Sequence, residues 1–408
     1  MVTPIYIIET VAFVDFLGVG LFVPLLMIYA RKIGGSHIQV GLLRSIYSTF
    51  QLGSGPLIGS LSDLKGRKQI LTMTLLISSV CYCLMGLTNS IYVLLSLRAV
   101  LGLVKQTQML TKAMVADYEK NKQKQEDTYG MLMAVSGAGM TLGPVIGGFV
   151  EESYPERGYS FIAITVGICF LFNAGLIFLL PSRTRWQQKS RNNIEPGNAI
   201  QIFFCSLQQS FLALYEIKWT QYGDIFIFKG LIGFAMGVYY AIYAAFLKER
   251  FDLTPKYIGG IISFQSIVGS MSCCFICFIN SFYTYDEDYS TRTFHVFLLL
   301  SAAYLGLIFA SNVLIYTLWL IPLSVGNSVS RLITLQMILN RSHGAHKGKL
   351  IGASNSVASF SGVVSPMVAG MIGEWVGVSY VIYASLFSTM LGVLVSFHNK
   401  QKRHYEEY

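Results

Sequence analysis

Twelve long apolar runs dominate this sequence, and they limit the folds that the chain can adopt. Each run is about 20 residues long, the length that an α-helix needs to cross a bilayer. Charged residues make up 12% of the chain, against about 25% in soluble domains, which argues against a soluble enzyme and a disordered protein. The runs cover residues 5–30, 38–62, 69–88, 91–115, 129–150, 159–181, 223–247, 257–282, 293–310, 313–337, 350–374 and 377–398.

The basic residues between the runs predict the orientation of the chain. If the N-terminus is cytosolic, 18 of the 30 lysines and arginines fall in cytosolic connections, 6 on the opposite side and 6 within the runs. Positive charge collects on the cytosolic side of membrane proteins. We therefore expect an all-α membrane protein with 12 transmembrane helices in two six-helix bundles and both termini in the cytosol. We expect it in the plasma membrane or in the membrane of an intracellular organelle.

The longest polar interruption divides the runs into six and six. We expect an N-terminal bundle over residues 1–181, a cytosolic linker over 182–222, a C-terminal bundle over 223–398 and a cytosolic tail over 399–408. In the second part of the linker, apolar residues recur at three and four positions. This spacing predicts an amphipathic helix on the cytosolic membrane face, with a partner-binding helix as the alternative.

The two halves carry the same pattern of small residues. A displacement of 222 residues carries Pro144 and the glycines around it onto Pro366 and its small neighbours, and Gly41 similarly corresponds to Gly259. Two six-helix halves in parallel repeat, with a pathway between them, are typical of one large class of secondary transporters.

One connection carries the most specific pattern in the chain, Gly59-Ser-Leu-Ser-Asp63-Leu-Lys-Gly66-Arg67-Lys68. Gly59 permits close helix approach, Gly66 permits a tight turn, and Asp63 can accept hydrogen bonds from Arg67. Such a cluster can hold one conformation closed, as a cytosolic gate. A basic loop that only orients the chain explains the lysine and arginine but neither glycine nor the aspartate.

This pattern resembles the loop signature of the major facilitator superfamily. Arg98 and Gly102 resemble the family's membrane arginine motif, and the segment from Gly139 to Gly148 resembles the motif of its antiporters. The first run, around Asp15, is similar to the first helix of the drug:proton antiporter, tetracycline-resistance-like branch. The resemblance implies the 12-helix fold of that family and proton antiport.

Two departures limit what this resemblance implies. The loop around Asp286 lacks the Gly-Arg-Lys signature expected in the second half. The third run, and the middle of the ninth, have no acidic residue where the tetracycline exporters carry theirs. We therefore do not expect tetracycline export by the bacterial mechanism.

Several charged residues lie within the apolar runs, where a charge facing lipid costs about 3 kcal/mol or more. Asp15 lies about 15 Å deep, near mid-membrane, and we expect it to couple a proton or the solute to transport. A permanent structural ion pair with Arg44 or Arg98 is the alternative. Arg98, Lys105 and Lys112 are spaced seven residues apart, which predicts a single face of one helix.

The excess of buried positive charge predicts a pathway that attracts an anionic or carboxylate-bearing solute, with ion pairing between the halves as the alternative. The candidate residues fall into four groups. We assign proton or substrate coupling to Asp15, Arg98, Arg44 and Lys105, and the cytosolic gate to Gly59, Asp63, Gly66, Arg67 and Lys68. An antiporter-like bend is expected at Gly139, Gly143, Pro144, Gly147 and Gly148, and pathway lining at Gln108, Lys229, Tyr239 and Arg331. Simple helix packing is the alternative for the glycines, and core packing for the tyrosine.

Together these features predict a secondary active transporter that moves a small organic solute by alternating access, coupled to protons in an antiporter-like way and accepting organic anions. The alternatives are a uniporter in which Asp15 is structural and a non-transporting receptor or scaffold. We expect no enzymatic activity, no catalytic residues, no cofactor and no metal site. The expected partners are the lipid bilayer, the solute and protons, without nucleic acid, and the expected state is a monomer.

Overall fold

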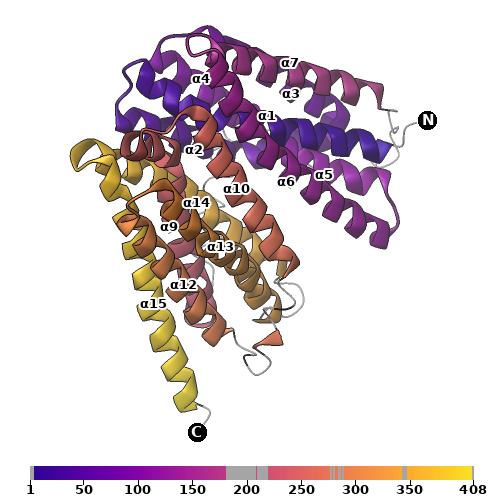
Figure 1. Cartoon of the computed structure of the whole chain (residues 1–408). Coiled ribbons are helices and arrows are strands. Elements are labelled where there is room, and N and C mark those ends of the chain that lie inside the picture. Colours follow the sequence, from indigo (N-terminus) through magenta and orange to yellow (C-terminus); the bar gives the residue numbers. More distant parts are fainter. Residues whose placement is uncertain are drawn as a thin grey trace. The chain divides into compact units, whose positions relative to one another are not determined.

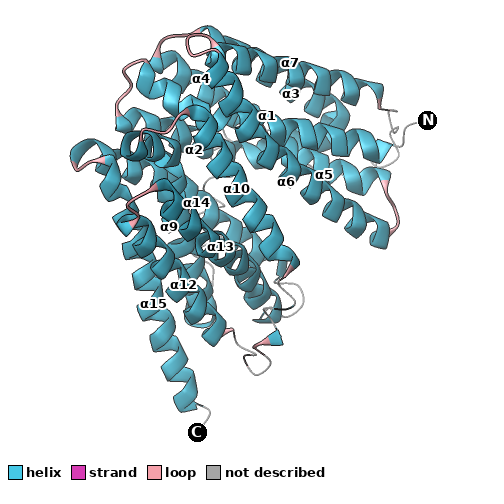
Figure 2. Cartoon of the chain, viewed as in Figure 1, coloured by secondary structure: helices cyan, strands magenta, loops and turns pink. Residues whose placement is uncertain are grey.

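The chain folds into long α-helices. The computed structural model describes residues 4–180, 208, 219–275, 278, 281–283, 286, 289–341 and 347–406, and these residues contain no strand (Figure 2). The helices in the first half are α1 (Pro4–Lys32), α2 (His37–Lys65), α3 (Arg67–Leu87), α4 (Ile91–Val104), α5 (Thr107–Tyr118), α6 (Lys122–Ser153) and α7 (Gly158–Leu179). Those in the second half are α9 (Trp219–Phe251), α10 (Pro255–Cys274), α12 (Ser290–Phe309), α13 (Val313–Arg341), α14 (Lys347–Trp375), the short 3₁₀ helix η3 (Val378–Tyr380) and α15 (Val381–Glu406).

Ten helical segments of the described chain are long and apolar enough to cross a membrane, with α4 and α5 together making one of them. The long helices outside these ten are α2 and α10, which correspond to the second and eighth apolar runs. All-helical structure is therefore confirmed, while the total of 12 transmembrane helices and the cytosolic position of both termini stay predictions.

The helices pack into two compact units. The first comprises Met1–Gly35, Ile46–Gln209 and Thr254–Ser263, and within it α1 packs against α6 and α7, and α3 against α7 (Figure 1). The second comprises Ser36–Ser45, Ser210–Leu253 and Phe264–Tyr408. Within it α9 packs against α14 and α15, and α12 against α13 and α15.

These units do not follow the predicted boundaries of 1–181 and 223–398. Each unit takes in a short segment from the other half of the sequence, because the first residues of α2 pack on α14 and those of α10 pack on α6. Nearly all of the predicted linker lies outside the described residues. The predicted tail is different as well, since α15 continues as a helix to Glu406.

The two exchanged segments make equivalent contacts, which supports the internal repeat. A Cβ atom added at Gly259 would collide with the carbonyl oxygen of Pro144, and one added at Gly41 would collide with that of Pro366. Glycine is therefore needed at both crossings, and the two crossings are related by the displacements seen in the sequence.

Hydrogen bonds next to these glycines repeat in the same way. The Ser263 hydroxyl donates to the Thr141 carbonyl oxygen at 2.5 Å, and the Ser45 hydroxyl donates to the Val363 carbonyl oxygen at 2.7 Å. The two donors are displaced by 218 residues and the two acceptors by 222, as are Gly41 and Gly259, and Pro144 and Pro366. The same side chain thus fixes the same helix crossing twice.

The glycine stripe of α6 serves close packing on α1. Cβ atoms added at Gly139 and Gly147 would lie 2.6 Å from the Phe13 carbonyl oxygen and 2.8 Å from the Leu21 carbonyl oxygen. One added at Gly143 would lie 2.6 Å from the backbone of Gly20. Helix α6 continues without a break through Pro144. These contacts match the helix-packing alternative, and a bend at Gly143-Pro144 stays a prediction.

Adjacent glycines provide a test of the exchanged crossing. Gly259→Ala should destabilise the purified protein by about 1–3 kcal/mol, because the new methyl group overpacks a backbone contact that cannot move aside. Gly260→Ala is the matched control, since nothing lies within 4 Å of a Cβ atom at that position. Thermal unfolding in detergent should show a lower midpoint for the first variant alone. Equal midpoints for both variants would contradict this packing.

Candidate functional site

The fourth predicted apolar run is not one helix. Helix α4 ends at Val104 and α5 begins at Thr107, because Lys105 and Gln106 leave the helical conformation, with φ/ψ of −77°/83° and −115°/30°. The prediction that Arg98, Lys105 and Lys112 share one helix face is therefore wrong. Discontinuous helices occur in transporters where backbone groups and side chains form a solute or ion site.

Side chains of α2 hold this break open. The Gln51 side chain donates to the Lys105 carbonyl oxygen at 3.1 Å, and the Gln106 side chain donates to the Gln51 carbonyl oxygen at 2.8 Å and to the Ser54 hydroxyl at 2.9 Å. The Ser54 hydroxyl in turn donates to the Gly102 carbonyl oxygen at 3.0 Å. These bonds replace part of the hydrogen bonding that the helix loses at the break.

A buried ion pair lies at the break. Lys105 Nζ is 3.3 Å from Asp15 Oδ1, and each side chain is 5% exposed. The same ammonium group is 3.5 Å from the Tyr82 hydroxyl and 4.9 Å from the centre of the Phe170 ring. Helix α1 thus supplies the acid, the helix break supplies the base, and aromatic rings of α3 and α7 enclose the pair.

Asp15 therefore pairs with Lys105, and not with Arg44 or Arg98 as the structural alternative supposed. Arg98 is 4% exposed, and its guanidinium carbon lies 4.3 Å from the centre of the Tyr47 ring. Tyr47 interacts electrostatically with Arg98, Lys105 and Asp15. Arg98 is thus connected to the ion pair through a tyrosine.

The other predicted coupling and lining residues lie elsewhere. Arg44 belongs to the second unit, where its Nη1 donates to the Tyr240 carbonyl oxygen at 2.9 Å. Gln108 is exposed on α5, and Lys229 is half-buried on α9. Tyr239 is 2% exposed, and its hydroxyl is 2.9 Å from that of Tyr316 in a cluster of aromatic rings. Its environment is that of a core residue.

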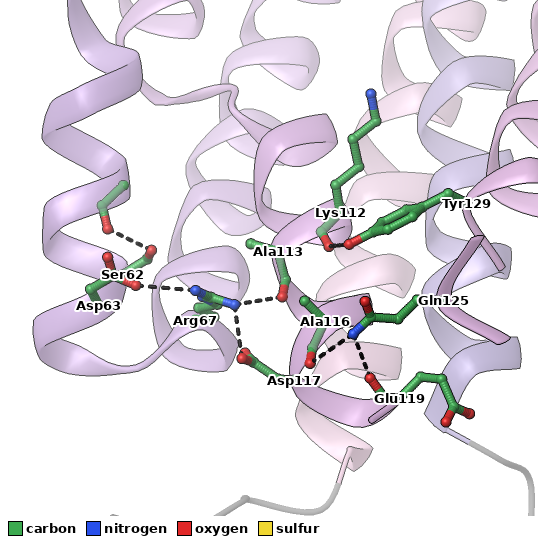
Figure 3. A network of polar contacts seen from close by, with 11 residues as sticks. Ser62, Asp63, Arg67, Lys112, Ala113, Ala116, Asp117, Glu119, Gln125 and Tyr129 are labelled. Atoms are coloured by element: carbon green, nitrogen blue, oxygen red, sulfur yellow. Dashed lines mark hydrogen bonds and ion pairs between the residues drawn. The ribbon is translucent and has the colours of Figure 1, made fainter. Parts of the chain in front are cut away.

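The predicted gate residues form a polar network at the turn from α2 to α3. Arg67 lies 3.3 Å from Asp63 and 2.8 Å from Asp117, and it also donates to the Ala113 carbonyl oxygen at 2.5 Å (Figure 3). Asp117, on α5, was not among the predicted gate residues. Arg67 therefore ties the α2–α3 turn to α5, the helix that follows the break.

The other gate residues have separate roles. Gly66 has φ of +98°, a conformation that favours glycine. The Lys68 ammonium donates to the Leu180 carbonyl oxygen at 2.5 Å, at the end of α7. Gly59 is not closely packed, since an added Cβ atom would meet only the Met109 methyl group, at 3.7 Å. The close helix approach expected at Gly59 is therefore absent.

The second half has its own acid–base pair where the Gly-Arg-Lys signature is missing. Asp286 lies 3.1 Å from Arg292 Nε and accepts hydrogen bonds from the backbone N–H groups of Thr291 and Arg292 at 3.1 and 2.9 Å. The arginine also covers the Tyr289 ring at 4.1 Å. A carboxylate in this position stabilises the N-terminus of α12.

Two glutamates that the sequence analysis did not single out hold the first turns of the exchanged segments. The Thr254 hydroxyl donates to Glu152 at 2.6 Å, and the His37 backbone N–H donates to Glu374 at 2.7 Å. The two glutamates are displaced by 222 residues, as are Pro144 and Pro366. The repeat relation was therefore a signal from which they could have been found.

The comparison with known protein families decides the identity of this fold. The model of the major facilitator superfamily matches residues 9–283, two thirds of the chain. The chain belongs to the major facilitator superfamily. As a member with ten helices suited to crossing a bilayer, it is an integral, multi-pass membrane protein. It is a secondary transporter that works by alternating access, and not an enzyme.

Relatives in this superfamily match the chain over nearly its full length. The quinolone resistance protein NorA of Staphylococcus aureus (strain COL) is 24% identical over 402 residues, which cover 98% of this chain and 97% of NorA. The class H tetracycline resistance protein of Pasteurella multocida is 24% identical over 412 residues, covering 97% and 96%. These relatives confirm the resemblance to the drug:proton antiporter branch.

A solved structure of the superfamily shows the same fold. The crystal structure of the human organic anion transporter MFSD10 (TETRAN) has a TM-score of 0.64 with 16% sequence identity, over 96% of this chain and 98% of that one.

The buried ion pair can be tested by removing one charge or both. Asp15→Asn and Lys105→Gln should each destabilise the purified protein by about 3–5 kcal/mol, because each leaves an uncompensated buried charge. The double variant should recover part of that loss. Lys112→Gln, at an exposed position, is the control for the loss of a lysine charge. Additive losses in the double variant, measured by thermal unfolding in detergent, would show that the two side chains are not coupled.

The Arg67 network can be tested in the same assay. Arg67→Gln should cost about 1–2 kcal/mol, since these partly exposed ion pairs contribute about 1 kcal/mol or less each and the carbonyl oxygen of Ala113 also loses its donor. Lys65→Gln removes the same charge from an exposed side chain on the same turn and should leave stability unchanged. Asp117→Asn should weaken the protein more than Asp63→Asn, because its contact is shorter. The reverse order would contradict the geometry described above.

Proposed function

We propose that this transporter carries small organic solutes by proton-coupled, antiporter-like exchange, and that organic anions are among them. The observation that carries the proposal is the buried pair of Asp15 and Lys105 at the break between α4 and α5. Asp15 would be the proton-binding group, and Lys105 its counter-ion in the unprotonated state.

The physical argument concerns what a proton would do to this pair. Protonation of Asp15 removes the negative charge and leaves the Lys105 ammonium group buried without its counter-ion. A buried charge that loses its partner is destabilised by about 3–5 kcal/mol. Proton binding would therefore favour a different arrangement, in which Lys105 moves to water or to another partner.

The helix break gives Lys105 a means of moving. Its backbone lies outside both helices, and its carbonyl oxygen is held by a side chain, Gln51. A rearrangement here would pass directly into α5, whose last turn is tied to the α2–α3 turn through Arg67 and Asp117. We propose that this connection links the protonation of Asp15 to the gate residues Asp63, Gly66, Arg67 and Lys68.

The nature of the solutes is proposed from charge and from relatives. Lysine and arginine side chains within the helices outnumber acidic ones, and a positive pathway favours anions. The names of the relatives refer to resistance against quinolones and tetracyclines, and the crystal structure is of an organic anion transporter. These names support small organic molecules with an ionisable group as substrates.

The alternative is a uniporter, and one observation favours it. Asp15 already has a counter-ion at 3.3 Å and is almost completely buried, as a purely structural ion pair would be. A uniporter would move its solute down the solute gradient without using a proton gradient. The two functions therefore differ in one measurable property.

Liposomes that contain the purified protein separate the two functions. With norfloxacin, which carries a carboxylate and an amine, an imposed pH gradient should drive accumulation several-fold above equilibrium. Asp15→Asn should abolish this accumulation because position 15 can no longer exchange a proton. Exchange of labelled for unlabelled norfloxacin without a pH gradient should continue in the variant.

The control is Asp252→Asn, which makes the same chemical change at an exposed residue between α9 and α10. Asp252 has φ of +49°, a conformation that asparagine also adopts. This variant should behave as the unmodified protein. Accumulation by the Asp15→Asn variant that still follows the pH gradient would assign a structural role to Asp15, and uptake by the unmodified protein that ignores the gradient would favour the uniporter.

A further inference from the structure

The second unit contains a polar cluster around Tyr240, in the middle of α9. The Gln265 side chain, from α10, donates to the Tyr240 hydroxyl at 2.9 Å. The Asn327 side chain, from α13, also hydrogen-bonds to this hydroxyl. Two amide side chains from different helices are thus directed at one hydroxyl group.

Two arginines approach the same tyrosine. Arg44 Nη1 donates to the Tyr240 carbonyl oxygen at 2.9 Å. Arg44 and Arg331 both interact electrostatically with the Tyr240 hydroxyl. The first residues of α2 and the middle of α13 therefore bring two positive charges toward a single half-buried side chain of the second unit.

Arg331 is the more accessible of the two arginines. Its side chain is exposed, and it forms no ion pair with any residue that the structure describes. It lies about 15 Å along α13 from the end of that helix at Arg341, too far for its charge to leave a bilayer at low cost. A charged residue at such a depth faces a water-filled pathway or a partner.

The first unit offers no equivalent cation. Lys105 has a carboxylate partner, Asp15, at 3.3 Å. A solute anion would therefore have to displace a buried carboxylate in order to reach Lys105. Arg331 would gain a partner without losing one.

Resting on the proposed transport of organic anions, we propose that Arg331 is the primary binding residue for the carboxylate of the solute. Arg44, Gln265, Asn327 and Tyr240 complete this subsite. A guanidinium group binds a planar carboxylate through two parallel N–H···O bonds, which gives both affinity and orientation. The two amides and the tyrosine hydroxyl supply further polar contacts, and the tyrosine ring can pack on an aromatic acid.

A pair of small aromatic probes tests the subsite by binding alone. Salicylate carries the carboxylate, and salicylamide has a similar shape without the charge. Equilibrium binding of labelled probes to the purified full-length protein in detergent should show that Arg331→Gln weakens salicylate binding by about tenfold or more, the loss expected for a charge-assisted bidentate contact. Salicylamide binding should stay the same.

Three further variants make the result specific. Arg331→Lys keeps the charge but loses the two-pronged contact, and it should bind salicylate with intermediate affinity. Tyr240→Phe keeps the ring and loses the hydroxyl, so it should weaken salicylate binding less than Arg331→Gln does. Lys248→Gln removes a positive charge from an exposed position on α9 and should bind salicylate normally. Thermal unfolding of each variant confirms that it is folded.

Unchanged salicylate binding by folded Arg331→Gln would overturn the subsite. So would an equal loss of salicylate and salicylamide, or a failure of the folded, unmodified protein to bind salicylate. The assay uses no pH gradient, so it fails independently of the proposed function. Salicylate binding through Arg331, together with solute uptake that ignores a pH gradient, would support the subsite and contradict proton coupling.

Discussion

The ion pair between Asp15 and Lys105 is the interaction on which the first unit depends. A single charge at that depth, with each side chain 5% exposed, would destabilise the unit by about as much as a typical domain's entire margin of stability. The pair requires Lys105 to leave the helix, and the break between α4 and α5 requires Gln51, Gln106 and Ser54 to satisfy the freed backbone groups. An arrangement with so many mutual requirements has few intermediate states, which suits a two-state switch.

The second constraint is the close approach of backbones at repeated glycines. Gly41 and Gly259 allow the first residues of α2 and α10 to join the opposite unit, where Ser45 and Ser263 fix them by equivalent hydrogen bonds. Because the same geometry occurs in both units, neither crossing is an accident of local packing. The polar centres of the two units nevertheless differ. The first holds a neutralised pair, and the second brings Arg331 toward the Tyr240 hydroxyl.

The sequence was sufficient for the helices, the family and the importance of Asp15, because apolar length, basic loops and the gate motif are local signals. It misassigned the partner of Asp15. No proline or glycine marks the break at Lys105 and Gln106, which depends on hydrogen bonds to residues about 50 positions earlier in the chain. Asp117 and the pair of Asp286 and Arg292 depend on similar turns and contacts. Glu152 and Glu374 could have been found, since the repeat relates them.

The central claim is that Asp15 takes up a proton and so separates from Lys105. Infrared difference spectroscopy on acidification measures this directly, since a protonated carboxyl group has a C=O stretching band that a carboxylate lacks. The account predicts such a band in the unmodified protein and its loss in Asp15→Asn, with Asp252→Asn unchanged. A band that persists in Asp15→Asn, or no band in the unmodified protein over the pH range in which it transports, would contradict the account.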